Sequence, residues 1–387
     1  MREVLLVAGE ASGDMHAAGV AEALRRLRPD LSLTGIGGER MEQAGVALIE
    51  RSDHLAVMGF VEVLRSVPRH RALLRQLSER LKSGRVATLV TVDYPGFNMR
   101  LAAAAQAAGV PVLYYITPQV WAWGASRLPK LARLVTRAAV ILPFEEALLK
   151  AHGIDATFVG HPLLDRATTL PTRDEARREL GVAPDARLLA VFPGSRQQEI
   201  DRHLEPFVAT AAELRRRDPA LQVMVSTAPG VTIDAARCPF PQVRASSLAL
   251  LRAADAALCK SGTTTLEAAV TGCPLVVGYR TSRWTHAIAR RLVRIPNIGL
   301  VNVVAGREVA REFVQDAFVP EQVADVLWPL LDLASDERRE LVAALAGVRA
   351  QLGTPGAAER VASMVSALAG TGSAPEAVSS SDRLHRA

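Results

Sequence analysis

The sequence contains few cysteines and no cluster of metal-binding residue types. Among its 387 residues are three cysteines, Cys238, Cys259 and Cys273, an odd number without CxxC spacing. We interpret them as small buried apolar residues in a reducing compartment, because a disulfide framework or a zinc site needs paired cysteines. The eight histidines form no HxxxH pair, so we predict no metal site and no cofactor.

Long apolar runs and the common nucleotide-binding fingerprints are also absent. No window approaches the ~18–20 uninterrupted apolar residues of a membrane-spanning helix. The apolar stretch 4–8 runs straight into Gly9 and Glu10, too short and too acidic for a signal peptide. Neither GxGxxG nor the P-loop pattern with its lysine occurs, which argues against a dinucleotide dehydrogenase and an ATPase. We therefore expect a cytoplasmic protein of another class.

What the sequence does contain is an alternation of short apolar runs and segments of helical period. The chain is 49% hydrophobic but only 4% aromatic, and its length predicts two domains with cores of Leu, Val and Ala. Strand-like runs occur at 4–8, 31–36, 86–92, 110–116, 138–142, 188–192, 221–226, 256–259 and 275–278, and helical segments at 15–27, 69–82, 98–108, 203–217 and 264–271. This alternation is typical of βαβ units and a mostly parallel sheet. We predict an α/β fold of two Rossmann-like, doubly wound domains that face a central cleft.

Prolines and glycines between residues 160 and 183 interrupt the alternation, which then begins again. We place the two domains at 1–165 and 166–345. A helical segment at 346–369 is expected to pack back on the first domain, and the Ser-rich stretch 370–387 is expected to be a disordered tail.

Two loops in the second half have the chemistry of phosphate binding. Gly194, Ser195 and Arg196 lie between a strand and a helix, where free backbone amides and a forked cation suit an anion. The second loop comprises Ser261, Gly262, Thr263 and Thr264, and Glu267 follows in the helix as a candidate acceptor for ribose hydroxyls. Ser195 as a simple helix cap and Glu267 as a dipole partner are the plainer alternatives. Two such loops in one domain favour a diphosphate-linked ligand.

The first half supplies carboxylates at the expected ligand edge of its sheet. Glu10, Ser12, Gly13 and Asp14 follow the first strand, and we interpret them as a glycine-containing loop for sugar hydroxyls or proton transfer. Asp93 directly follows the buried strand 86–92, where partial desolvation suits a general base, with Glu10 as the reserve base. Helix capping by Asp14 and turn capping by Asp93 remain alternatives.

Three further features suggest contact with lipid, phosphate or sugar. Met58, Phe60, Val61 and Leu64 are followed by arginines, a pattern of an interfacial segment or of an ordinary amphipathic helix. Arginines 280–294 suit phosphates or anionic lipid, and no nucleic-acid module accompanies them. Trp121 is a candidate sugar or lipid contact.

Several motifs together resemble the lipid-A-disaccharide synthase family. They are GEASGD at 9–14, VMGFVEVL at 57–64, YITPQVWAW at 115–123, LPFE at 142–145, FVGHP at 158–162, PGSR at 193–196 and SGTTTLE at 261–267. The resemblance implies a GT-B fold and no required metal. It implies transfer from UDP-2,3-diacylglucosamine to 2,3-diacylglucosamine 1-phosphate with inversion, giving a β-1,6-linked disaccharide phosphate and UDP. It also implies a peripheral protein on the cytoplasmic face of the inner membrane, in lipid A synthesis.

The resemblance also assigns roles by position. Asp93 matches the candidate base, Arg196 the diphosphate contact, Glu267 the ribose contact and Asn302 a site asparagine. The sequence departs from the family pattern at Gly96, where a second carboxylate is usual.

Other interpretations of the same sequence are a UDP-sugar 2-epimerase, a transferase acting on peptidoglycan lipid intermediates, and a non-catalytic nucleotide- or lipid-binding peripheral protein. A homo-oligomer is left open.

Overall fold

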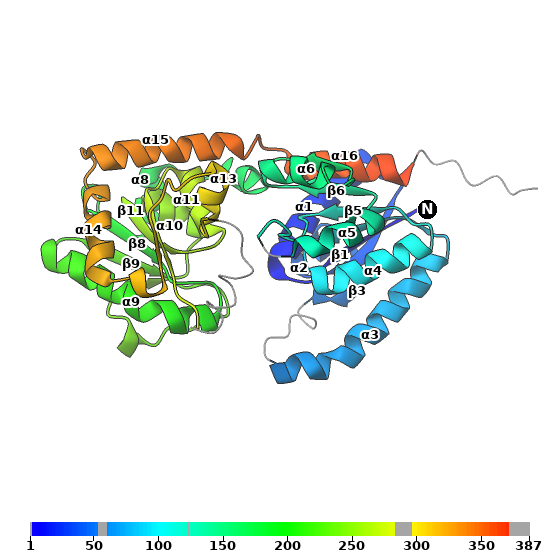
Figure 1. The fold of residues 1–387 in the computed structure, drawn as a ribbon, viewed down its shortest axis with the longest axis horizontal. Helices are drawn as coiled ribbons and strands as arrows, with labels where there is room; N and C mark the ends of the chain where they lie inside the picture. Colours follow the sequence, from blue (N-terminus) through cyan, green and yellow to red (C-terminus); the bar gives the residue numbers. More distant parts are fainter. Residues whose placement is uncertain (1, 53–59, 123, 283–295, 371–387) are drawn as a thin grey trace, which may run out of the picture.

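The chain folds into two α/β lobes, each built on a parallel sheet (Figure 1). The computed structural model describes residues 2–52, 60–122, 124–282 and 296–370, the side chains of residues 60–67 excepted. The strand orders are β3-β2-β1-β4-β5-β6-β7 and β10-β9-β8-β11-β12-β13. Both are doubly wound, because the order reverses between β1 and β4 and again between β8 and β11. The predicted fold class is confirmed.

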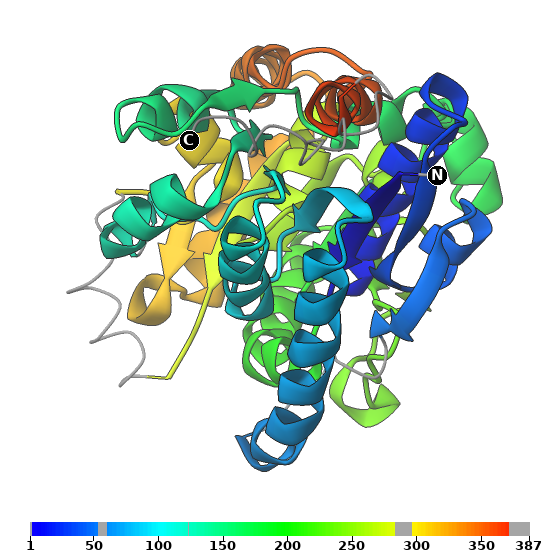
Figure 2. The same cartoon turned by 90° about the vertical axis from the view of Figure 1, so that its right-hand side faces the viewer.

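The central strands of the first sheet are buried on both faces, as parallel strands between helices require, whereas its edge strands are partly exposed. Its strands are β1 (Glu3–Ala8), β2 (Ser32–Gly37), β3 (Ala47–Arg51), β4 (Val86–Val92), β5 (Val112–Tyr115), β6 (Arg137–Val140) and β7 (Ala156–Phe158). The helices around it are α1 (Ala11–Leu27), α2 (Glu39–Gln43), α3 (Phe60–Lys82), α4 (Pro95–Ala107), α5 (Leu128–Leu134) and α6 (Pro143–Lys150). In both views the first turns of α3 extend beyond the rest of this domain (Figures 1 and 2).

The second sheet contains β8 (Leu188–Phe192), β9 (Gln222–Ser226), β10 (Gln242–Val243), β11 (Ala256–Lys260), β12 (Leu275–Tyr279) and β13 (Glu312–Val314). Its helices are α7 (Leu163–Ala167), α8 (Arg173–Glu179), α9 (Gln197–Arg217), α10 (Ser247–Ala253), α11 (Thr264–Thr271), α13 (Leu300–Ala305), α14 (Pro320–Leu330) and α15 (Asp336–Gln351). None of the described helices of either domain is both long and apolar enough to cross a membrane. Cys238, Cys259 and Cys273 are all free and buried, as predicted.

The chain passes between the domains twice, and the two crossings touch. His161 donates its backbone N–H to the Leu352 carbonyl at 2.9 Å. Arg360 then donates to the carbonyls of Val159 (2.8 Å) and Thr354 (2.6 Å), which ties both crossings together. Helix α15 packs in the second-domain core, so the predicted boundary at residue 346 falls inside a helix and the crossing lies near residue 353.

After the second crossing, α16 (Ala357–Ala369) lies beside α1 on the first domain (Figures 1 and 2). Its apolar residues Val361, Met364 and Val365 join the same buried cluster as Val4 and Leu6 of β1. Arg28 donates to Ser366 Oγ at 3.3 Å. The first domain is therefore completed by the last described helix of the chain. The rest of the predicted tail, 371–387, lies outside the described residues.

A buried ion pair stabilises the second sheet at the amino ends of its central strands. Arg177, 2% exposed, donates from Nη2 to Asp255 Oδ2 at 2.8 Å, and the Leu188 N–H donates to the same oxygen at 2.8 Å. Asp255 precedes β11 and Leu188 begins β8, so this network fixes the amino ends of two central strands.

Candidate active site

The predicted site loops lie at the two topological switch points. Glu10 follows β1 and Asp93 follows β4, the pair of strands at which the first sheet reverses its order. The loop 193–196 follows β8 and the loop 261–263 follows β11, the corresponding pair in the second sheet. In open α/β sheets ligands bind beyond the carboxyl ends of the strands at this point. The topology therefore brings each predicted pair of loops together in its own domain.

Asp93 and Tyr94 have an unusual backbone conformation. Their φ angles are +46° and +48°, in the left-handed region that residues with side chains seldom occupy. Neighbouring groups hold the turn in place, because the Asp93 carbonyl accepts from Asn98 Nδ2 at 2.7 Å and from the Tyr114 hydroxyl at 2.8 Å. Strained residues of this kind persist only where the surroundings fix them, and they gather at functional sites.

The same turn explains the glycine of the first loop. A Cβ atom at Gly9 would lie 2.3 Å from Cδ1 of Tyr94. Only glycine therefore lets the β1 loop pass the strained β4 turn, and this close approach brings Glu10 near Asp93.

The electrostatics of Asp93 suit a proton acceptor. Burial raises the pKa of the Asp93 carboxyl above its ordinary value, and the negative charge of Glu10 raises this pKa further. The same two causes raise the pKa of Tyr94. Because the ionised form of this carboxylate is destabilised, it takes up a proton more readily than an ordinary aspartate. A general base has to take up a proton in this way.

An ion pair between Arg196 and Glu10 joins the two domains at their switch points. Arg196 Nη2 lies 3.5 Å from Glu10 Oε2, and the two side chains are 56% and 46% exposed. A pair this exposed contributes about 0–1 kcal/mol. It marks where the two switch points face one another, and it is weak enough for a phosphate to take over the guanidinium.

The anion-binding groups of the β8 loop already hold an anion from the protein itself. The Ser195 N–H donates to Glu199 Oε2 at 2.9 Å, and Lys260 Nζ donates to Glu199 Oε1 at 2.8 Å. Burial opposes ionisation of Glu199, but Lys260 and the Ser195 amide outweigh it and lower the pKa of this carboxyl. Sequence reasoning missed both Glu199 and Lys260. The four-residue spacing of Ser195 and Glu199 was only a weak signal of their contact. Lys260 lies in β11, far along the chain, so the sequence carries no signal of its contact with Glu199.

Gly194 is required in this loop for its backbone. Its φ is +148°, and a Cβ atom there would lie 2.5 Å from Cβ of Glu199.

The β11 loop and the first turn of α11 are hydrogen-bonded to the segment around the start of α13. Ser261 Oγ donates to the Ile298 carbonyl at 2.7 Å, and the Val301 N–H donates to Thr265 Oγ1 at 3.3 Å. Gly262 and Thr264 are half-buried and Thr263 is exposed. Glu267 is 6% exposed beneath this loop, and its Oε1 lies 3.3 Å from Arg166 Nη1. Sequence reasoning missed Arg166, which belongs to α7.

Two predicted ligand contacts have structural roles. Asp14 is buried, and its carboxylate accepts from the backbone amides of Gly38 (2.6 Å), Arg40 (3.1 Å) and Met41 (3.1 Å), which caps α2. These bonds favour helix capping, the alternative interpretation of Asp14, and its role as a sugar contact stays a prediction.

Asn302 is also fully occupied. Its Nδ2 donates to the Ala310 carbonyl (2.7 Å) and Glu312 Oε1 (2.8 Å), and its Oδ1 accepts from the N–H groups of Val309 (2.8 Å) and Ala310 (2.9 Å). At 0% exposure it shapes the turn after α13 and offers no free group to a sugar.

The remaining predictions in the first domain have mixed outcomes. Helix α1 begins at Ala11, so Ser12 and Gly13 lie in its first turn rather than in a loop, Ser12 exposed and Gly13 buried. Met58 lies outside the described residues, and so do the side chains of Phe60, Val61 and Leu64.

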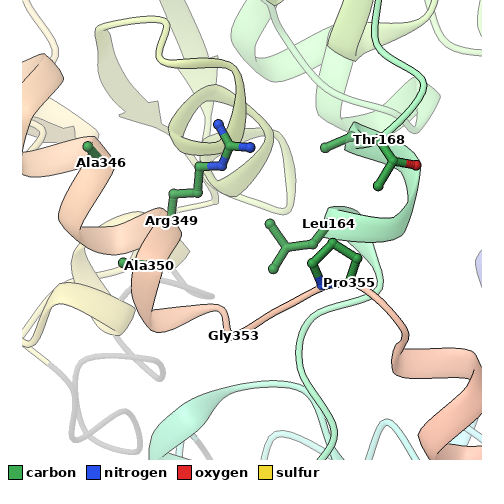
Figure 3. A pocket seen from close by; sticks show the side chains of 8 residues that line it. Leu164, Thr168, Ala346, Arg349, Ala350, Gly353 and Pro355 are labelled. Atoms are coloured by element: carbon green, nitrogen blue, oxygen red, sulfur yellow. The ribbon is translucent and has the colours of Figure 1, made fainter.

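Two cavities lie near the junction of the domains. One, of about 340 Å³, lies beside the crossings between α7 and α15, where Leu164, Arg349 and Pro355 line it (Figure 3). It contains none of the predicted site residues. The other, of about 440 Å³, lies between α6 and α13 and includes Trp121 and Asn302.

Comparison with known proteins identifies the relatives of this chain. The family model described as lipid-A-disaccharide synthetase matches residues 4–351. The chain belongs to this family. A lipid-A-disaccharide synthase of Trichlorobacter lovleyi is 40% identical over 376 residues, which cover 94% of this chain and 97% of the relative. Another, of Anaeromyxobacter sp. (strain K), is 41% identical over 375 residues, which cover 94% and 96%. The predicted family is confirmed, and the lipid-A-disaccharide synthetase family makes this chain a glycosyltransferase.

Solved structures agree on the fold. UDP-GlcNAc 2-epimerase from Neisseria meningitidis has a TM-score of 0.63 at 12% identity, covering 94% of this chain and 99% of that one. MurG of Acinetobacter baumannii has a TM-score of 0.54 at 16% identity, with coverage of 94% and 99%. At such identities the likeness shows the fold alone. The family match, not the fold, favours the transferase over the epimerase.

Proposed function

We propose that the chain transfers a diacylglucosamine unit from its UDP derivative to the 6-hydroxyl of 2,3-diacylglucosamine 1-phosphate. The products are a β-1,6-linked lipid A disaccharide 1-phosphate and UDP. Family membership supports the reaction. The location of the active site is supported by the two switch points that face each other, one with carboxylates and the other with the loops proposed to bind the diphosphate.

In this proposal the second domain holds the UDP. The diphosphate lies at the loops 193–196 and 261–264, where amides and helix amino ends attract negative charge. Arg196 exchanges its weak contact with Glu10 for the diphosphate. As the bond between the anomeric carbon and the diphosphate oxygen breaks, the electron pair leaves with UDP, and these donors stabilise the growing charge. Glu267, fixed by Arg166, accepts from the ribose hydroxyls.

Asp93 acts on the acceptor. Its carboxylate takes the proton from the 6-hydroxyl while that oxygen attacks the anomeric carbon on the face opposite the diphosphate, so the configuration inverts. The strained turn fixes the carboxylate at the crevice edge. Glu10, close to Asp93, binds the acceptor side and keeps the pKa of Asp93 raised.

The direct test mixes the purified chain with both lipids in detergent and follows UDP release, with the products identified by mass spectrometry. We expect UDP release that depends on the acceptor, together with a disaccharide phosphate. Release from the donor alone, or isomerisation of the donor without acceptor, would instead indicate a hydrolase or a 2-epimerase. No turnover with UDP still bound would leave the non-catalytic binding protein.

We further propose that the enzyme works at the cytoplasmic face of the inner membrane and touches it with the start of α3. The support is the apolar-then-basic sequence of residues 57–71 and the extension of this helix beyond the domain (Figure 2). The protein should float together with vesicles that contain anionic lipid. Replacement of Phe60 and Leu64 by Ser should abolish this co-flotation while UDP binding persists. Unchanged flotation would return the segment to an ordinary amphipathic helix.

A further inference from the structure

The cavity between α6 and α13 has walls from both domains. Trp121, Phe144 and Leu148 come from the first domain, and Asn297, Val303 and Gly306 are among those from the second. It lies next to the proposed diphosphate loop, because Ser261 of that loop is hydrogen-bonded to Ile298, the residue after Asn297, and Thr265 in the following turn of α11 is bonded to Val301 of α13.

The Trp121 indole and the Asn302 amide, two of the three polar side chains that line this cavity, are already bonded within the protein, and Asn297 is the third. Trp121 Nε1 donates to Glu145 Oε1 at 3.0 Å, and the other Glu145 oxygen accepts from the Leu142 N–H at 3.1 Å. The amide of Asn302 makes four bonds to its own turn, as described above. The Trp121 ring meets Phe144 edge to face, with centroids 5.2 Å apart. What these residues present to the cavity is therefore hydrocarbon and aromatic surface.

This largely apolar lining disfavours sugar hydroxyls and phosphates, because a polar group buried there without a hydrogen-bond partner is destabilised. An alkyl chain gains on entry, at about 0.8 kcal/mol per methylene buried. The volume of about 440 Å³ falls in the range of ligand sites, roughly 300–1,000 Å³.

We infer that this cavity binds one acyl chain of the nucleotide-linked donor sugar. This rests on the proposed function, which supplies an acylated donor at the loop beside α13. The donor rather than the acceptor is assigned because the second-domain wall of the cavity is joined to the diphosphate loop. The cavity is assembled from both domains, so the chain length that fits depends on α6 and α13 together.

The test narrows the cavity and measures donor preference. Leu148→Trp fills space from α6, and Ala147→Trp is the matched control because Ala147 is exposed on the same helix and does not line the cavity. Donors whose acyl chains differ by two methylenes at a time are compared by kcat/KM. Each excluded methylene should cost about fourfold, so Leu148→Trp should shift the long-to-short donor ratio by roughly tenfold or more.

Phe144→Ala widens the cavity and should shift the ratio toward longer donor chains. Both variants should bind UDP normally, and both should leave the dependence on acceptor chain length unchanged. If the donor ratio is the same in Leu148→Trp, Ala147→Trp and the parent, the inference is wrong. A shift in acceptor preference alone would also overturn it.

A second readout separates this inference from the proposed reaction. If the parent chain turns over no donor, the reaction fails, and binding alone tests the cavity. A fatty acid brominated along its chain should quench tryptophan fluorescence, and the quenching should be largely lost in Trp121→Phe. Quenching that persists in that variant would show that the acyl chain binds elsewhere.

Discussion

The most informative single change is Asp93→Asn, because the structure separates its catalytic effect from its effect on folding. Asparagine has nearly the same shape and tolerates the left-handed region in which Asp93 lies, with φ +46°. The bonds that hold the turn go to the Asp93 main chain, from Asn98 and Tyr114. The variant therefore keeps the turn and loses only the basic oxygen.

The expected loss follows from general base catalysis. Removal of a positioned base typically lowers the rate by about 10²–10⁴-fold, which corresponds to about 3–5 kcal/mol of transition-state stabilisation. UDP affinity should stay within about twofold of the parent, because the nucleotide loops belong to the other domain.

Although Asp93→Asn should lower activity, it should leave the folding stability at pH 8 unchanged or raise it. Burial and Glu10 raise the pKa of Asp93 in the folded protein. A raised carboxyl pKa gives stability that is fully present at low pH and is lost as the pH rises through the folded value. At pH 8 the ionised Asp93 is therefore a cost, and Asp93→Asn should melt at the same temperature as the parent or higher.

The assay is a pH series of kcat/KM beside a thermal melt at pH 8. Activity of the parent should fall with decreasing pH through the raised pKa of Asp93, so its acid limb should lie above the ordinary aspartate pKa of about 4. Glu10→Gln should move this limb to lower pH, since it removes the charge that raises the pKa. A variant Asp93→Asn that keeps more than a tenth of the parent kcat would refute Asp93 as the base. Collapse in Glu10→Gln instead would move the role to Glu10.

Four further predictions concern other parts of the molecule. Arg196→Gln should lower kcat by roughly 10²-fold, because Arg196 would stabilise the leaving diphosphate. Its melting temperature should stay close to that of the parent, and single-turnover rates and a thermal melt measure the two effects. Asn302→Leu should lower stability by about 1–3 kcal/mol through unpaired buried amides, and a loss of UDP affinity without unfolding would contradict its structural role. Arg177→Met should lower stability by about 1–3 kcal/mol, because four backbone carbonyls lose the guanidinium that donates to them while Arg173 remains paired with Asp255; a denaturant titration measures this loss. Burial lowers the pKa of His161 to about 3, so stability should fall as pH drops below 6.5, and His161→Gln should flatten this dependence between pH 5 and 7.

Much of the frame could be predicted from the sequence because it depends on local patterns. The runs 86–92, 188–192 and 264–271 have the bounds predicted for them, since buried parallel strands and a glycine-capped helix are strong signals. Short edge strands such as β3 and β13 were missed, because a three- to five-residue half-buried run resembles a loop. Helix α1 began earlier than predicted, because Gly13 reads as a loop residue although close packing on Ala8 favours it there.

The site residues divide in the same way. Positions after strands, such as Asp93, are readable because topology alone brings strand ends together. Pairings between distant segments are not readable, and Glu199 with Lys260, Glu267 with Arg166 and Trp121 with Glu145 all belong to this group. Asp14 is an example, because a carboxylate in a glycine-containing segment suggests a ligand contact. Its capping of α2 becomes visible only in the tertiary fold.

The return of α16 to the first domain has a consequence for synthesis of the chain on the ribosome. Residues 3–8 leave the exit tunnel long before residues 361–365, but the cluster that includes Val4 and Leu6 is finished only by Val361 and Val365. The second domain, by contrast, has all its strands by residue 314 and its last core helix by residue 351. Although domains commonly fold in the order in which they emerge, here the second domain can close before the first. Part of the apolar surface of the first domain therefore stays uncovered until residues 361–365 have emerged from the ribosome.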